Sequence, residues 1–289
     1  MRGLWSLGGL TWRELLLRTA RESWQDNVFG IAARLAFYHF VALFPSLLLL
    51  FLSFQPGSAP ESAIRGALED GVRHVLPARG AALIAQIVAD LHRSASQSGG
   101  IWAAIGSALW ASINGAYALI DGLNLAYEVE ERRSFFRVVR IALAITAVVA
   151  ILTLAALVSG QLAAASFDRM NAPALGVAVR WLIIAAALFI CFAIFFRIAP
   201  NLKERQWQWS TPGAVVAAII WIGSTIAFRF WTNRFDSYPR IYGRVAPALS
   251  LLIWLYVTGA TVLIGGELNS EIEKAAVEGG RDHEIRRKK

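Results

Sequence analysis

Long apolar segments separated by short charged blocks dominate the pattern along this chain. A helix that crosses a bilayer needs roughly 20 mostly apolar residues, and six segments meet this requirement. They are Gly30–Leu52, Gly100–Leu123, Val138–Leu162, Val177–Ile198, Pro212–Trp231 and Pro247–Leu268. The pattern therefore predicts an all-α membrane protein in which residues 30–269 form a bundle of six transmembrane helices.

Two further regions show helical periodicity but carry too many charges to cross a bilayer. Residues 10–24, within an N-terminal segment of residues 1–29, place these side chains on one face: Trp12, Leu15, Leu16, Thr19 and Ser23. This spacing predicts an amphipathic helix at the inner membrane interface. Residues 55–98 contain two such patterns, one after Pro60 and one after Pro77. They predict an amphipathic helical hairpin that lies on the outer side, between the first two spans.

The charge distribution predicts the orientation of the bundle. Only 17% of the residues are charged and 56% are hydrophobic, with a mean hydropathy of +0.51, whereas soluble domains carry about a quarter charged residues. The predicted inner segments hold 17 lysines and arginines and the outer ones hold 8. Positive residues are enriched in cytoplasmic loops, so we expect both termini to lie on the cytoplasmic side. Residues 270–289 would then be a basic cytoplasmic tail.

The residues that enzymes need are scarce in this sequence. The four histidines stand apart from one another, and no run of aspartates could hold paired metal ions. No Walker A motif is present. The single cysteine, Cys191, has no partner for a disulfide, and the N-terminus lacks the pattern of a removable signal peptide. We therefore expect no enzymatic activity, no cofactor and no metal. The net charge of +8 is explained by anionic lipid headgroups rather than by nucleic acid.

Polar residues inside the predicted spans are the candidate functional residues, because ionisable groups at membrane depth are costly and normally face the bundle interior or a water-filled cavity. In the second span, Asn114, Asp121 and Asn124 share a helix face with Tyr117. A neighbouring stripe of small residues should let another helix approach closely. The stripe consists of Gly115, Ala118 and Gly122.

The predicted topology places charged residues of several spans at a similar depth near the inner side. Arg34, Asp121 and Glu267 are expected to meet in one polar cluster, and Glu267 follows a flexible glycine pair, Gly265 and Gly266. The predicted polar cavity consists of Arg34, Asn114, Asp121, Asn124, Glu267 and Asn269. The alternative is that these groups only tie helices together or reach toward the headgroups, which is the interpretation we favour for Arg197.

Several stretches resemble the YihY/BrkB family of bacterial inner-membrane proteins. They are LAFYHFVALFP (35–45), ASINGAYALIDGLNLAYE (111–128), RRSFF (132–136), PGA (212–214) and YGRVAPALSLLIWLYVTGATVLIGGELN (242–269). Their order and spacing cover nearly the whole chain. The resemblance implies an integral inner-membrane protein with six spans. Members have been called ribonuclease BN, and some are linked to virulence, serum resistance or envelope integrity.

Two functional hypotheses follow from the residues and the resemblance together. The first is a transporter-like or lipid-handling protein, without its own ATPase, whose partners are membrane lipids and whose substrate is amphipathic. The alternative is a structural or envelope-integrity factor that acts through protein partners. A ribonuclease would need clustered carboxylates, histidines or an acid–base pair, and the sequence offers none. The oligomeric state is left open.

Overall fold

The computed structural model describes residues 4–52, 62, 65–66, 68, 83–84, 86, 101–202, 212–234 and 243–287. The elements with defined bounds are all helices: η1 (Leu4–Gly9), α1 (Trp12–Gln25), α2 (Val28–Leu52), α5 (Ile101–Ala126), α6 (Phe135–Arg169), α7 (Pro173–Ile198), α8 (Pro212–Arg234), η3 (Gly243–Val245) and α10 (Ala246–Arg287). The described residues contain no strand, so the predicted all-α class is confirmed.

Each of the six predicted spans corresponds to a long helix, but among the residues that the structure describes only five helices are long and apolar enough to count as candidate membrane spans. These five are α2, α6, α7, α8 and α10. The helix that is left out is α5, which carries Asn114, Asp121 and Asn124. It nevertheless packs along α2 and α6. A sixth crossing through α5 therefore stays a prediction.

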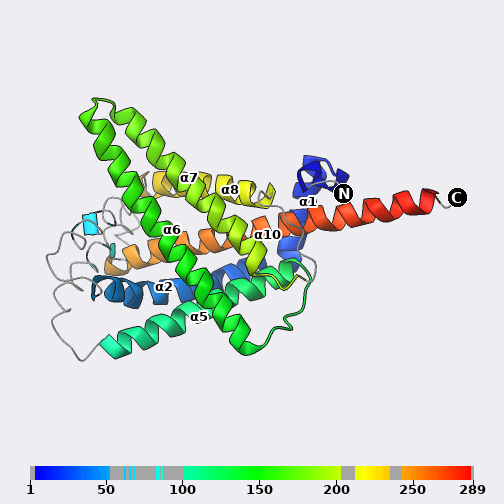
Figure 1. Ribbon diagram of the computed structural model, residues 1–289, viewed down its shortest axis with the longest axis horizontal. Helices are drawn as coiled ribbons and strands as arrows, with labels where there is room; N and C mark the ends of the chain where they lie inside the picture. Colours follow the sequence, from blue (N-terminus) through cyan, green and yellow to red (C-terminus); the bar gives the residue numbers. More distant parts are fainter. Residues whose placement is uncertain are drawn as a thin grey trace.

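The helices form a bundle with α10 in contact with α2, α5, α8, α1 and η1. Both chain termini lie at the same end of this bundle, together with the α5–α6 connection and the end of α7 (Figure 1). The turn between α6 and α7 lies at the opposite end. This arrangement agrees with termini on one side of the membrane, and we call their end of the bundle the inner end.

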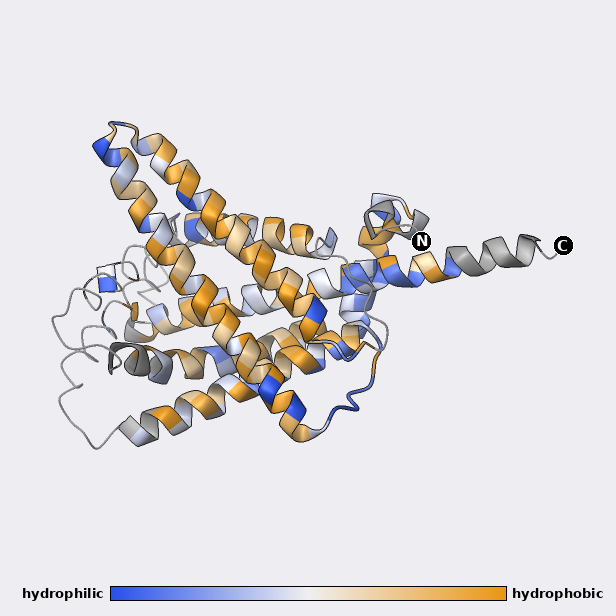
Figure 2. Ribbon diagram, viewed as in Figure 1, coloured by the Kyte–Doolittle hydropathy of each residue, from blue (hydrophilic) through white to orange (hydrophobic). Residues whose placement is uncertain are grey.

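The α6–α7 hairpin crosses the other helices obliquely and extends away from them (Figure 1). Its two helices are strongly apolar along most of their length (Figure 2). Nevertheless, only 11% of the most apolar stretch of α6 and 6% of that of α7 is buried within the chain. With 35 residues, α6 extends beyond the predicted 138–162 and would be about 52 Å long. A helix of this length spans a hydrocarbon core of about 30 Å only when it is tilted or projects beyond it.

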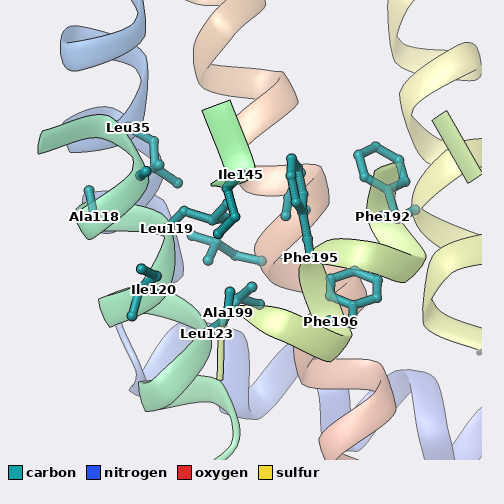
Figure 3. Packing of buried hydrophobic residues seen from close by; sticks show 14 of the residues in the cluster. Leu35, Ala118, Leu119, Ile120, Leu123, Ile145, Phe192, Phe195, Phe196 and Ala199 are labelled. Carbon is teal, nitrogen blue, oxygen red and sulfur yellow. The ribbon is translucent and has the colours of Figure 1, made fainter. Parts of the chain in front are cut away.

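Side chains from six helices make the main apolar core, and α8 contributes Ala217 and Trp221 to it. Leu35 of α2, Leu119 of α5, Ile145 of α6 and Phe195 of α7 converge in this cluster (Figure 3), and Leu263 of α10 belongs to it as well. The rings of Phe192 and Phe196 stack with centroids 6.4 Å apart. The core therefore ties the oblique α6–α7 hairpin to α2, α5 and α10.

Helix α1 begins with a capping box, in which the Thr11 side chain accepts from the Glu14 amide and Glu14 accepts from the Thr11 amide. Three residues of the predicted face are buried: Leu15, Thr19 and Ser23. Trp12 and Leu16 were expected on the same face but are 50% and 53% exposed. Because the buried stripe packs against α10 and α2, these other apolar side chains remain available for the membrane interface, whose contact with α1 stays a prediction.

Two predicted regions outside the spans have different outcomes. Most of residues 55–98 lies outside the described residues, so the outer hairpin stays a prediction. Of this region, the described Leu68 and Ile84 are buried against Leu47 of α2 and Leu251 of α10. The predicted tail, 270–289, is not a separate segment at its start, because α10 continues as a helix to Arg287.

Cysteine labelling tests the orientation. In a variant without Cys191, cysteines introduced at Ser6 or Glu284 are expected to resist an impermeant thiol reagent in intact cells, whereas one at Ser96 should react. The reason is the excess of positive charge in the predicted inner segments. Permeabilised cells provide the control, since all three positions should then react. Labelling of either terminus in intact cells would reverse the proposed orientation.

Candidate functional site

An ion pair between Arg34 of α2 and Asp121 of α5 lies near the inner end of the bundle, where the sequence places both residues. The guanidinium donates to the carboxylate, and the two side chains are 43% and 52% exposed. The small residues of α5 allow the close approach of α2 that this pair needs. A Cβ at Gly122 would lie 2.9 Å from Ile31, and one at Gly115 would lie 3.4 Å from His39. The predicted small-residue contact is therefore confirmed.

Aromatic side chains are exposed along the two helices that form this ion pair. Phe37 of α2 is 54% exposed, and Trp110 and Tyr117 of α5 are 55% and 48% exposed. Helix α5 runs from the outer to the inner end, so Trp110 and Tyr117, which precede Asp121, lie closer than Asp121 to the outer end. On α2, which runs the opposite way, Phe37 lies closer than Arg34 to the outer end. We call this surface, with Arg34 and Asp121, the α2–α5 seam.

Asn114 also lies on α5, where its amide donates to the carbonyl of Trp110 at 2.7 Å. This bond stays within one helix, so Asn114 does not join the described ion pair through it.

Asn124 is part of a separate network, the inner clasp, which joins the α5–α6 connection to the end of α7. The side-chain amide nitrogen of Asn124 donates to the Glu131 carboxylate at 2.9 Å, and its side-chain oxygen accepts from the backbone amide of Asn201 at 2.8 Å. Arg133, whose side chain is 5% exposed, pairs with Glu131 and donates to the Ala199 carbonyl at 2.7 Å. It thereby satisfies a carbonyl at the C-terminus of α7, where intrahelical donors are lacking.

The electrostatics of the inner clasp favour an ionised Glu131. Its hydrogen bonds with Arg133 lower its pKa to about 2, against a smaller opposing effect of burial. The bond from Asn124 acts in the same direction as that from Arg133. The clasp is therefore a charged, fully formed network at neutral pH.

Glu267 and Asn269 lie at a third place, on α10 near the turn between α1 and α2. Both residues are completely buried. The charged groups that act on Glu267 are Asp26, Lys274 and Glu22. The charged neighbours of Glu267 therefore differ from those of the Arg34–Asp121 pair, and the predicted meeting of all three residues in one cluster stays a prediction.

The glycines that precede Glu267 also differ from the prediction. Gly265 and Gly266 lie inside the continuous helix α10 and make close contacts. A Cβ at Gly265 would lie 2.8 Å from Phe196, and one at Gly266 would lie 2.5 Å from Leu123. They are packing positions for α7 and α5 rather than a flexible pair. Asn269 accepts a hydrogen bond from the amide of Gly213, at the start of α8, at 2.9 Å.

Five of the six predicted site residues therefore occupy the seam, the clasp and the buried part of α10, whereas the described bond of Asn114 stays within α5. A cavity that they share stays a prediction. Sequence reasoning missed Asp26, Glu131, Arg133 and Asn201, which lie in turns and connections outside the predicted spans. Their place in the short polar segments that flank the predicted spans was the available signal. Within the described parts of the chain, no three His, Cys, Asp or Glu side chains gather as a metal site requires.

Comparisons with known proteins give consistent matches. A family model described as virulence factor BrkB matches residues 19–289. The ribonuclease-like protein YfkH of Bacillus subtilis (strain 168) is 32% identical over 255 residues, covering 84% of this chain and 89% of the relative. A UPF0761 membrane protein of Psychromonas ingrahamii is 24% identical over 263 residues, covering 90% and 88%. One of Stenotrophomonas maltophilia (strain K279a) is 33% identical over 84 residues, covering 29% and 20%. No solved structure matches.

Proposed function

Because the chain belongs to the BrkB family of membrane proteins, as its motifs predicted, we propose that it moves or accommodates a lipid-like, amphipathic molecule without an ATPase of its own. The observation that carries this proposal is the half-exposed ion pair Arg34–Asp121 on the α2–α5 seam. No catalytic step is part of the proposal, and the protein acts as a carrier and not as an enzyme.

A half-exposed charged pair at this depth needs polar partners besides its own two members. Arg34 is the seventh residue of α2 and Asp121 lies five residues before the end of α5, so each is about 8–9 Å from the inner helix end. Ionisable groups at membrane depth normally face the interior or a water-filled cavity, whereas these are about half exposed. A lipid headgroup that enters from the inner leaflet would supply polar partners for both charges.

The charges and the aromatic residues of the seam together favour a zwitterionic phospholipid. The guanidinium of Arg34 matches the geometry of a phosphate, and the carboxylate of Asp121 can accept from an ammonium group. Phe37, Trp110 and Tyr117 then offer an apolar surface to the acyl chains toward the outer end. Such a molecule would lie along the seam with its headgroup at the ion pair.

The test is movement of labelled lipid in liposomes. The purified full-length chain is reconstituted, and transfer of a fluorescent phosphatidylethanolamine between leaflets is followed by quenching of the outer leaflet. We expect Asp121→Asn and Arg34→Gln to slow transfer by about tenfold or more, because a hydrogen bond between charged groups contributes about 1.5–3 kcal/mol. Arg132→Gln is the matched control, since Arg132 pairs with Glu130 on an exposed connection outside the helices.

Two outcomes would overturn the proposal. If the inserted, folded protein transfers lipid no faster than empty liposomes, the structural or envelope-integrity hypothesis remains. If transfer is unaffected by both seam variants, the ion pair is a helix contact only. Cleavage of RNA that disappears when one defined carboxylate is replaced would restore the nuclease hypothesis suggested by the name of the Bacillus relative.

A further inference from the structure

Glu267 is a carboxyl group in an unusual environment. It is 0% exposed, and among the described residues neither of its oxygens has a hydrogen-bond donor. The amide nitrogen of Asn269, two residues later, likewise has no acceptor there. Buried polar groups are normally paired, and an ionised carboxylate buried without donors is strongly disfavoured. The missing element at Glu267 is therefore a hydrogen-bond donor.

The group that faces Glu267 is another carboxyl, that of Asp26. Asp26 closes α1, and the next residue, Asn27, has φ +52°, a left-handed conformation that asparagine adopts more readily than most residues. This turn brings the Asp26 carboxyl within hydrogen-bonding range of Glu267. Two carboxylates cannot donate to one another, but a single proton turns one of them into a donor.

Other charged and titratable groups surround this carboxyl pair. They come from α1, from the end of α5 and from α10: Glu22, Tyr127, Glu128, Glu271, Glu273 and Lys274. Lys274 already pairs with Glu128 at 2.8 Å and with Glu271 at 2.9 Å. Burial holds the pKa of Tyr127 well above its usual range, so its phenol remains neutral. The first turns of α8 and η1 contain no titratable side chain. The surroundings are therefore mainly acidic.

We propose that Asp26 and Glu267 bind one proton between them and so form a proton-binding site that holds the α1–α2 turn against α10. A metal ion is a less suitable ligand than a proton. Among the described residues, no third Asp, Glu, His or Cys side chain joins Asp26 and Glu267 in the arrangement that a metal site requires. When the proton leaves, two facing carboxylates remain, and their repulsion opposes the contact between the turn and α10. The site rests on its own geometry and does not depend on lipid transfer.

The direction of the pH dependence follows from Asp26. Burial raises its pKa, with the hydrogen bond to Glu267 and the charge of Lys274 acting in the opposite direction. In the unfolded chain an aspartate titrates near about 3.9. The folded state therefore binds more protons above this pH, and its stability falls as the pH rises from about 4 through the raised pKa.

The experiment uses the full chain in lipid nanodiscs. The thermal unfolding midpoint of the unaltered chain is expected to fall by about 3–5 °C as the pH rises from about 4 to about 8. Asp26→Asn and Glu267→Gln should each remove this fall, because an amide supplies the donor at every pH. Glu278→Gln is the matched control, since Glu278 also links α10 to α1, through Arg18, but is 63% exposed.

Infrared spectroscopy provides the second readout. At low pH the carbonyl band of a protonated carboxylic acid should be present, and it should disappear in either amide variant but not in Glu278→Gln. If Glu267→Gln fails to fold, Asp26→Asn at the partly exposed turn still decides the question. An unchanged midpoint profile in Asp26→Asn, or a carboxylic-acid band that persists in that variant, would overturn the proposal.

Discussion

Replacing Gly213 by alanine is expected to destabilise the protein by about 3–5 kcal/mol, although alanine is normally the better helix former. A Cβ at this position would overlap the carbonyl oxygen of Gly265 and lie 2.6 Å from Cγ of Asn269. The backbone of α10 cannot yield as a flexible side chain would. Overpacking costs about 1–3 kcal/mol, and loss of the buried bond from the Gly213 amide to Asn269 adds about 1–3 kcal/mol.

Gly223 provides a matched control on the same helix. It also lies in α8, but a Cβ there would meet nothing within 4 Å. Gly223→Ala should therefore stabilise α8 by up to about 1 kcal/mol, the usual difference between the two residues in a helix. Thermal unfolding of both variants in the same detergent or nanodisc measures the contrast. Equal effects of the two substitutions would show that α8 and α10 do not approach as closely as described.

Replacing Arg133 by alanine should have the next largest effect, a loss of about 3 kcal/mol. Its buried side chain donates to Glu131 and to the last carbonyls of α7, at Ile198 and Ala199. Removing one member of a buried pair strands the other charge and costs about 3–5 kcal/mol, here reduced because Glu131 is 22% exposed. The neighbouring Arg132→Ala is the control, since Arg132 is 69% exposed in its pair with Glu130 and exposed pairs contribute little.

The same substitution should change the response to acid. The pKa of Glu131 is lowered from 4.5 to about 2, mainly by Arg133, so the stability that the clasp contributes is fully present above pH 4.5 and is lost as the pH falls to about 2. Unfolding of the unaltered protein and of Arg133→Ala at neutral and acidic pH measures this difference. A stability gap between them that does not shrink on acidification would contradict the assignment of this pair.

The seam was accessible to sequence reasoning, whereas most of the remaining polar structure was not. Arg34 and Asp121 were paired from depth alone, because a bilayer fixes how far each residue lies from its helix end. Asn124 was assigned to the same cavity, and sequence reasoning did not foresee its hydrogen bonds with Glu131 and Asn201. Depth does not specify which way a side chain turns around the helix axis, and the clasp residues lie in connections where no periodicity constrains them.

The sequence by itself determined the helices and much of what lies within them. Runs of about 20 apolar residues can only satisfy their backbone in a bilayer as helices, and the predicted face of α1 contained its three buried residues, Leu15, Thr19 and Ser23, together with Trp12 and Leu16, which are exposed. Only the tertiary structure decided the partners of Arg133 and Glu267, which are Ala199 and Asp26. These pairs join distant parts of the chain, and their contact depends on the rotation and tilt of whole helices, which are set by packing against neighbours.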